Sequence, residues 1–302
     1  MLTDDGVELY VQESGVDGAP VTVVFVHGWA LSSASWAAEA EALGRVARVI
    51  RYDQRGHGRS AGLPRSPASI PRLAEDLYGL LDALVPDGPV VLVGHSMGGM
   101  TILALAGSHP ELFGGRVAGV ALVDTSASGL RGGTLDLSRP LGWVFRPLMA
   151  LLMLFWRRLP RLADRIRRLL LSPRSPTVRR VTRRFLFGPG ALEEVVAVGA
   201  ELIDSAPTRT VGAFYPALMA HDQDAALPSL RGTPTLILVG DSDHLTPPAH
   251  SLRMAAALPE AELVQVPDSG HLLLMERPAV VSSHLLRLVE RVAAGSVPQA
   301  PS

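Results

Sequence analysis

The chain of 302 residues contains no cysteine, and its 28 basic residues are all arginine, so that lysine is absent as well. Without a thiol, a cysteine nucleophile, a disulfide framework and a cysteine metal site are excluded. Without lysine, a Schiff base, a lysine-bound pyridoxal phosphate, a Ser-Lys dyad and a phosphate-loop lysine are excluded. No His-Glu-x-x-His motif or comparable ligand cluster is present either, and we therefore expect no metal and no cofactor.

Targeting and membrane-spanning segments are also missing. The N-terminus has no cationic stretch followed by an apolar one, so no secretory signal is predicted. One uncharged apolar run, Leu148 to Trp156, has nine residues and lies between Pro147 and Pro160, which makes it too short to cross a bilayer. We therefore expect a cytoplasmic protein.

Apolar strand patterns alternate with helical patterns along most of the chain, and 47% of the residues are hydrophobic. This alternation predicts an α/β fold with a mostly parallel central sheet flanked by helices. The predicted strands are Leu9 to Gln12, Val21 to Val26, Ala47 to Tyr52, Val90 to Val93, Val117 to Val123, Thr235 to Val239 and Glu262 to Val266. The predicted helices are Trp36 to Leu43, Ile70 to Leu84, Met97 to Gly107, Pro248 to Leu258 and Pro278 to Val292.

A Gly-x-Ser-x-Gly motif joins one of these strands to the helix that follows. Gly94 and Gly98 flank Ser96, directly after the buried strand Val90 to Val93. Small residues let the chain turn sharply from strand to helix, and this turn exposes the serine hydroxyl at the carboxyl end of the sheet. The start of the helix also favours a negatively charged oxygen. Ser96 is therefore the candidate nucleophile.

A carboxylate and a histidine follow Ser96 along the chain, each after a further predicted strand. Asp243 lies in a Gly-x-x-Asp-x-x-x-Pro pattern, and His271 lies in a Gly-His-x-x-x-x-Glu-x-Pro pattern. The order Ser, Asp, His differs from the orders in chymotrypsin and subtilisin. In these motifs the chain resembles the α/β-hydrolase superfamily, in its serine-nucleophile, lid-containing, esterase- and lipase-like branch. The resemblance covers nearly the whole chain apart from a central insertion.

The resemblance implies catalytic roles for these residues. His271 would be the general base and Asp243 the acid that orients it, while Asp241, two residues before, and Asp124, at the end of an earlier strand, remain alternative acids. His57, in a loop motif that this superfamily often carries, is expected to be structural.

An early loop, His27-Gly28-Trp29, is similar to the His-Gly-x loop of the same superfamily. By that similarity the backbone N–H groups of Trp29 and Met97 would form an oxyanion hole. The Trp29 side chain could wall the acyl pocket or simply pack in the core, and Trp29, His95 and Leu245 are the candidate substrate-binding residues.

The family pattern also predicts a domain division. Residues 1–124 and 231–294 would form the hydrolase core, 125–230 a helical lid or cap insertion, and 295–302 a flexible tail. The insertion is strongly cationic, because the segment from Arg139 to Arg184 holds 13 arginines and one acid, Asp164, a charge of +12 in a chain of net charge −1. In this segment Leu162, Ile166 and Leu169 fall on one helical face, with arginines on the neighbouring face.

Two interpretations of this charge pattern stay open. The plainer one, which we favour from sequence, is a lid whose apolar face covers the active site and whose arginines pair with the acidic core or are solvated. The second is peripheral contact with an anionic membrane surface. Nucleic-acid binding is not expected, since no recognition motif accompanies the charge. The oligomeric state is not predicted.

We therefore expect a serine hydrolase that cleaves a carboxylic ester of a mostly apolar small molecule through an acyl-enzyme. The same groups would also serve a thioesterase, a C–C bond hydrolase or a cofactor-free perhydrolase or haloperoxidase. A non-catalytic ligand receptor built on the same fold is the alternative from another class.

Overall fold

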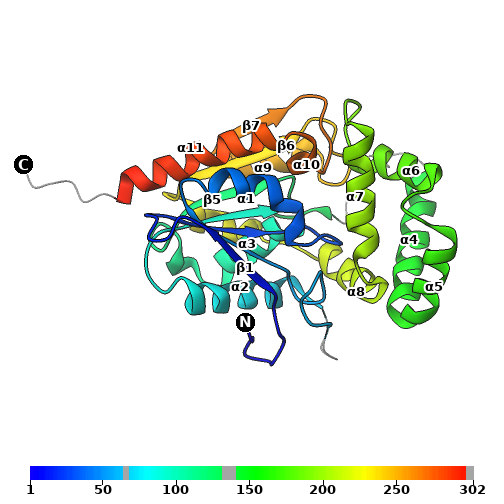
Figure 1. The fold of residues 1–302 in the computed structure, drawn as a ribbon. Helices are drawn as coiled ribbons and strands as arrows, with labels where there is room; N and C mark the ends of the chain where they lie inside the picture. Colours follow the sequence, from blue (N-terminus) through cyan, green and yellow to red (C-terminus); the bar gives the residue numbers. More distant parts are fainter. Residues whose placement is uncertain (64–67, 131–140, 297–302) are drawn as a thin grey trace, which may run out of the picture.

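The computed structural model describes residues 1–63, 68–130 and 141–296, apart from the side chains of 141–146 and 296. The described residues do not include residues 131–140 of the predicted lid, Arg139 among them, or residues 297–302 of the predicted tail. Figure 1 shows a central sheet with helices on both faces and a group of helices at one end.

Seven strands form one sheet in the order β1-β3-β2-β4-β5-β6-β7. Strand β1 pairs antiparallel with β3, and all other neighbours are parallel. The strands are β1 Val11–Gly15, β2 Thr22–Val26, β3 Arg48–Tyr52, β4 Val90–His95, β5 Val117–Val123, β6 Thr235–Gly240 and β7 Glu262–Val266. The central strands β2, β4 and β6 are buried along their whole length, as expected for a parallel sheet covered on both faces. The predicted mostly parallel α/β architecture is confirmed.

Two apolar layers hold helices against the sheet. One layer packs α2, α3 and α9 on one face, and the other packs α1 and α11 on the opposite face. The core helices are α1 Ala37–Leu43, α2 Ile70–Leu84, α3 Met97–Ser108, α9 Pro248–Ala257, α10 Leu273–Glu276 and α11 Pro278–Ser296. Since α11 continues to Ser296, residues 295 and 296, predicted to begin the tail, are helical.

The chain between β5 and β6, called the insertion below, forms the group of helices at the end of the molecule. Its helices are α4 Leu141–Arg158, α5 Pro160–Leu170, α6 Pro176–Leu186, α7 Glu193–Ser205 and α8 Thr208–Met219. A 3₁₀ segment, η4 Asp224–Leu230, returns the chain to β6. Helices α4, α5 and α6 stand farther from the sheet than α7 (Figure 1). Within the described ranges, no helix combines the length and the hydropathy needed to cross a membrane.

Candidate active site

Ser96 lies at the junction of β4 and α3 with φ 50° and ψ −116°, a backbone conformation that residues other than glycine rarely adopt. The turn closes because its neighbours have no side chains. A Cβ on Gly98 would lie 2.1 Å from the carbonyl oxygen of Val26, and a Cβ on Gly94 would lie 2.6 Å from the carbonyl carbon of Gly98. The sequence thus dictates a tight elbow that holds the serine at the carboxyl end of the sheet.

His271 reaches Ser96 from the loop that follows β7, residues 267–272, called the histidine loop below. Its Nε2 atom lies 3.0 Å from Ser96 Oγ, and its Nδ1 atom lies 2.8 Å from Asp243 Oδ2. Since a carboxylate only accepts hydrogen bonds, Nδ1 carries the proton of the neutral ring, and Nε2 is left to accept the Ser96 hydroxyl. The three predicted residues therefore form one hydrogen-bonded chain, and all three are buried.

Asp243 is held by its own loop, residues 241–247 after β6, called the acid loop below. Its Oδ1 accepts the backbone N–H groups of Leu245 and Thr246, and its Oδ2 accepts the Thr246 hydroxyl at 2.7 Å. Burial opposes ionisation here, but the neighbouring His271 and these hydrogen bonds outweigh it and lower the pKa of Asp243. Asp243 is therefore an ionised carboxylate aimed at the imidazole.

The other two candidate acids make different contacts. Asp241 is exposed and accepts hydrogen bonds from the Ser242 hydroxyl and, at 3.4 Å, from the Ser269 N–H. Asp124 is fully buried, and its oxygens accept the N–H groups of Gly240 and Leu273. Burial and the charge of nearby Asp243 raise the pKa of Asp124 well above its usual range. Neither has a hydrogen bond to His271.

The His27-Gly28-Trp29 loop lies against the elbow. A Cβ on Gly28 would come within 3.3 Å of Ser96 Cβ, so this loop passes directly beside the candidate nucleophile. His27 Nδ1–H donates to the Gly28 carbonyl, and its Nε2 accepts the Gln54 N–H at 2.9 Å. Burial lowers the pKa of His27, so its ring stays neutral. Trp29 directly follows Gly28 in this loop, and Met97 directly follows Ser96 at the start of α3.

The side chains of the candidate substrate-binding residues lie in different environments. Trp29 is half-buried, and its Nε1–H donates to the Val211 carbonyl at 3.2 Å. His95 is 1% exposed, and its Nε2–H donates to the His271 carbonyl at 2.8 Å. Burial, followed by the electrostatic interaction with the neighbouring His271, lowers the pKa of His95 to about 3. His95 therefore contacts the backbone of the histidine loop, and half-buried Leu245 contacts Asp243 through its N–H.

Glu276, a further residue of the site, was not assigned a role from the sequence, although it stands in the histidine motif. Its two carboxylate oxygens accept the N–H of Gly270 at 2.8 Å and the N–H of Gly188 at 2.9 Å. Gly188 belongs to the insertion, so Glu276 joins the histidine loop to the insertion. The motif spacing from His271 was the signal that could have identified it.

An apolar cavity of about 620 Å³ lies between α4 and α8 of the insertion. Its lining is Leu130, Pro147, Ala150, Met153, Leu154, Arg157, Gly212, Tyr215, Pro216 and Met219. Ser96, Asp243 and His271 are not part of this lining. The Trp29 and Tyr215 rings, whose centroids are 6.2 Å apart, connect the two regions.

Two further groups of polar residues in the described part of the chain are either buried or ion-paired. His57, predicted to be structural, is buried with its ring 5.2 Å from the His27 ring, and burial lowers its pKa to about 3. The one cluster of metal-type ligands found among the described residues is Asp4, Asp5 and Asp76. These carboxylates are ion-paired with Arg55 and Arg72, so their charge is already compensated.

Residues 21–278 match the family model for the alpha/beta hydrolase fold. The chain belongs to the α/β-hydrolase family. It is 31% identical over 299 residues to a protein of Caulobacter segnis named as carbamate hydrolase RutD, a match that covers 95% of this chain and 98% of that protein. It is 30% identical to the mouse sn-1-specific diacylglycerol lipase ABHD11, over 87% of this chain and 78% of the lipase.

A solved structure of a thermophilic esterase from Thermogutta terrifontis superposes on this hydrolase with a TM-score of 0.74. The two share 30% sequence identity, and the match covers 97% of each chain. The chain thus belongs to a family of hydrolases, and the proteins similar to it are named for carbamate, lipid and ester substrates.

Proposed function

We propose that this hydrolase cleaves carboxylic esters of mostly apolar small molecules by a Ser96-His271-Asp243 acyl-enzyme mechanism. The observation that carries the proposal is the continuous hydrogen-bonded chain from Ser96 Oγ to His271 Nε2 at 3.0 Å and from His271 Nδ1 to Asp243 Oδ2 at 2.8 Å. A serine hydroxyl needs such an adjacent base to become a nucleophile.

In the acylation half, Ser96 Oγ attacks the ester carbonyl carbon while His271 Nε2 takes the hydroxyl proton. The ionised Asp243 stabilises the imidazolium that forms. The carbonyl oxygen becomes an oxyanion, which the N–H groups of Met97 and Trp29 would bind. Collapse of this intermediate breaks the ester bond, and the imidazolium gives its proton to the departing alcohol.

In the deacylation half, the neutral His271 removes a proton from water as the water oxygen attacks the acyl-serine carbonyl. The second tetrahedral intermediate uses the same two N–H groups. The bond to Ser96 Oγ then breaks, the proton returns from His271 to Ser96, and the carboxylic acid leaves. Every proton taken in either half is returned, so no cofactor is required.

The apolar substrate class rests on the cavity beside Trp29. Its lining is mostly leucine, methionine, proline and alanine, and a small charged molecule such as carbamate would leave most of its 620 Å³ unfilled. An acyl chain or an aromatic group would bury apolar surface there. The similarity to a diacylglycerol lipase and to an esterase supports the same class.

The test is labelling with a fluorophosphonate, followed by intact mass measurement, together with turnover of nitrophenyl esters from acetyl to long acyl. We expect one label per chain and turnover in the wild type, and neither in Ser96→Ala. Retention of the label in Ser96→Ala would place the nucleophile elsewhere. Parallel assays with a thioester, a diketone, a carbamate and, with peroxide, a peracid-forming reaction would contradict the ester assignment if any of these gave the higher kcat/KM.

A further inference from the structure

The outer part of the insertion exposes an unusual number of leucines. Seventeen large hydrophobic side chains are exposed among the described residues, and ten of them fall within residues 148–171. These ten are Leu148, Leu151, Leu152, Leu154, Leu159, Leu162, Ile166, Leu169, Leu170 and Leu171. Such a concentration of exposed apolar side chains marks an interaction surface. We call α4, α5 and Leu171 the outer hairpin.

The sequence of α5 explains how the leucines come to face outward. Leu162, Ile166 and Leu169 repeat at helical spacing and share one exposed face, whereas Ala163, on another side of the helix, is 1% exposed. The small alanine lets the helix pack closely on the rest of the insertion. The larger apolar residues are therefore directed away from the protein.

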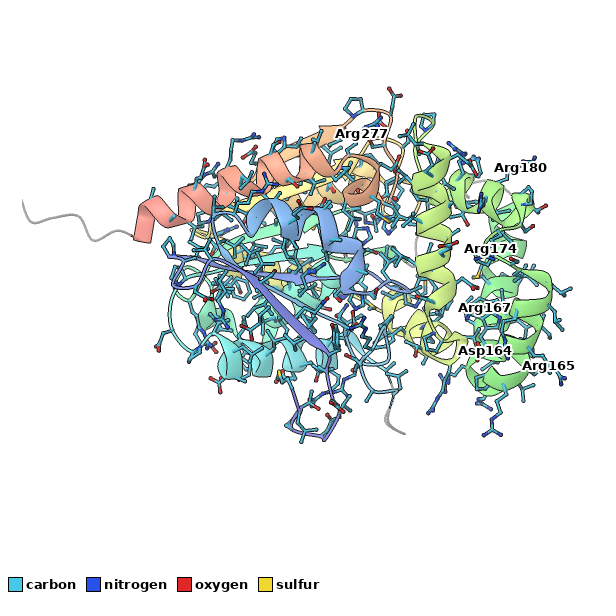
Figure 2. All side chains as sticks on the ribbon, viewed as in Figure 1. Asp164, Arg165, Arg167, Arg174, Arg180 and Arg277 are labelled. Carbon is cyan, nitrogen blue, oxygen red and sulfur yellow. The ribbon has the colours of Figure 1, made fainter. Side chains whose placement is uncertain are left out.

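Arginines border this apolar face, and four of them have no partner of opposite charge among the described residues. Arg157 and Arg158 end α4, and Arg161 and Arg165 lie on α5, all four exposed. None of the four forms an ion pair with any described residue. Other arginines of the insertion do, since Arg167 contacts Asp164 and Asp204. Figure 2 places Arg165 on the outer side of the insertion, away from the sheet.

The geometry points to a docking surface for anionic lipid bilayers. The leucines of the outer hairpin would enter the boundary between headgroups and acyl chains, and the four unpaired arginines would bind lipid phosphates. The helices would lie along the surface, because no helix in the described part of the chain is long and apolar enough to span a bilayer.

A second copy of this chain fits the surface less well. A symmetric dimer through the outer hairpin would bring two sets of unpaired arginines together, which is unfavourable. Outside the insertion the exposed large hydrophobic side chains among described residues are single and scattered: Leu2, Val16, Val46 and Leu252. The described residues outside the insertion therefore offer no matching apolar surface, whereas an anionic bilayer satisfies both the leucines and the charges.

The charge distribution also sets the orientation in which the protein would approach an anionic bilayer. The segment Arg139 to Arg184 carries +12, and the remaining residues carry −13, because the whole chain has a net charge of −1. An anionic surface attracts the first and repels the second. The molecule would therefore approach with the outer hairpin first.

The experiment is co-sedimentation of the full chain, without substrate, with vesicles of phosphatidylcholine alone or with about 30% phosphatidylglycerol. We expect binding to the anionic vesicles that falls at least tenfold when salt rises from about 0.05 to 0.5 M, because exposed charges are screened. Arg158→Gln/Arg161→Gln/Arg165→Gln, which leaves out Arg157 because it lines the cavity, and, separately, Leu162→Ser/Leu169→Ser/Leu170→Ser should each reduce binding at least tenfold. The controls are Leu2→Ser/Leu252→Ser and Arg45→Gln/Arg231→Gln. These four residues are exposed and lie outside the insertion, so both control variants should bind normally.

Turnover of a soluble short-chain ester, measured on the same variants, separates this inference from the proposed function. Unchanged turnover would show that the variants are folded, and absent turnover in the wild type would refute the ester proposal without affecting the docking result. Equal binding to neutral and anionic vesicles would overturn the inference. Absence of vesicle binding would overturn it as well. In that case, concentration-dependent self-association that the leucine variant abolishes, measured by analytical ultracentrifugation, would assign the surface to a second copy of the chain.

Discussion

Asp124 accepts hydrogen bonds from two backbone N–H groups, one just before the loop of Asp243 and one just after the loop of His271. It has no hydrogen bond to the imidazole. Its Oδ1 accepts the N–H of Gly240 at 2.9 Å, and its Oδ2 accepts the N–H of Leu273 at 3.3 Å. Gly240 leads into the acid loop, and Leu273 follows the histidine loop. Asp124 therefore ties together the two loops whose side chains form the Asp243–His271 pair. This division of work between two buried carboxyl groups gives the first prediction.

Asp243→Asn should lower ester turnover by about 10⁴-fold, because the amide cannot stabilise the imidazolium and favours the wrong tautomer. Asp124→Asn should lower turnover far less and should mainly lower the melting temperature, because one of its oxygens becomes an NH₂ group facing a backbone donor. Exposed Asp241→Asn is the control. Steady-state kinetics and thermal melts on all three variants decide the matter, and a loss in Asp124→Asn as large as in Asp243→Asn would reassign the acid.

We expect the variant Ser96→Gly to be more stable than the variant Ser96→Ala. Its φ of 50° strains any residue with a Cβ, so Ser96→Ala keeps the strain and Ser96→Gly removes it. The larger conformational entropy of glycine in the unfolded chain offsets part of this gain. We therefore expect the free energy of unfolding of Ser96→Gly to be about 1 kcal/mol higher than that of Ser96→Ala. Urea denaturation of both variants measures this difference. Equal stabilities would mean that the elbow is not strained.

Glu39 should make the protein less stable as the pH rises. It is fully buried on α1, its carboxyl oxygens have no hydrogen-bond partner on any other described residue, and burial raises its pKa from 4.5 to about 8. The folded state keeps the proton that the unfolded state loses above pH 4.5. The stability from this group is therefore complete below pH 4.5 and is lost as pH rises through 8.

We expect Glu39 to reduce the free energy of unfolding by on the order of 2–4 kcal/mol between pH 5 and pH 8. Urea denaturation at both pH values should show this loss in the wild type and not in Glu39→Gln. Glu41→Gln, on the same helix and 79% exposed at its side chain, is the control and should behave as the wild type. The same pH dependence in Glu39→Gln would assign the effect to other groups.

Filling the cavity between α4 and α8 should shorten the preferred substrate. Ala150 lines it, and Ala150→Trp would occupy the volume available to an acyl chain. We expect kcat/KM to fall at least tenfold for long acyl esters, as an order of magnitude for a blocked apolar pocket, and to stay nearly constant for acetyl esters. Exposed Ala38→Trp on α1 is the control. A uniform loss across chain lengths would place the acyl chain elsewhere.

Most of the core elements could be predicted from the sequence because their signals are local. Buried strands such as β4 and β6 read as continuous apolar runs, and the glycines around Ser96 indicate the elbow. β1 was predicted at Leu9 to Gln12, whereas the ladder with β3 runs from Val11 to Gly15. Leu9 is buried like a strand residue but binds the backbone of Met1 instead of β3.

The contacts that organise the site depend on distant parts of the chain and could not be read from spacing. His95 and His271 are 176 residues apart in the sequence, and Glu276 and Gly188 are 88 residues apart. Only the folded topology places them within hydrogen-bond distance. The helices of the insertion were also predicted only as a group, because their apolar faces are divided between the protein and solvent.

The contacts between the insertion and the histidine loop restrict how the insertion can move. A Cβ on Gly270 would lie 2.5 Å from the carbonyl carbon of Phe187, and the N–H of Leu272 donates to the carbonyl of Leu186. Glu276 adds its bond to Gly188. The end of α6 is thus bound to the loop that carries His271, and a rigid displacement of the whole insertion would pull the imidazole away from Ser96. A conformational change that keeps the base in place would therefore have to leave Leu186 and Gly188 in place as well.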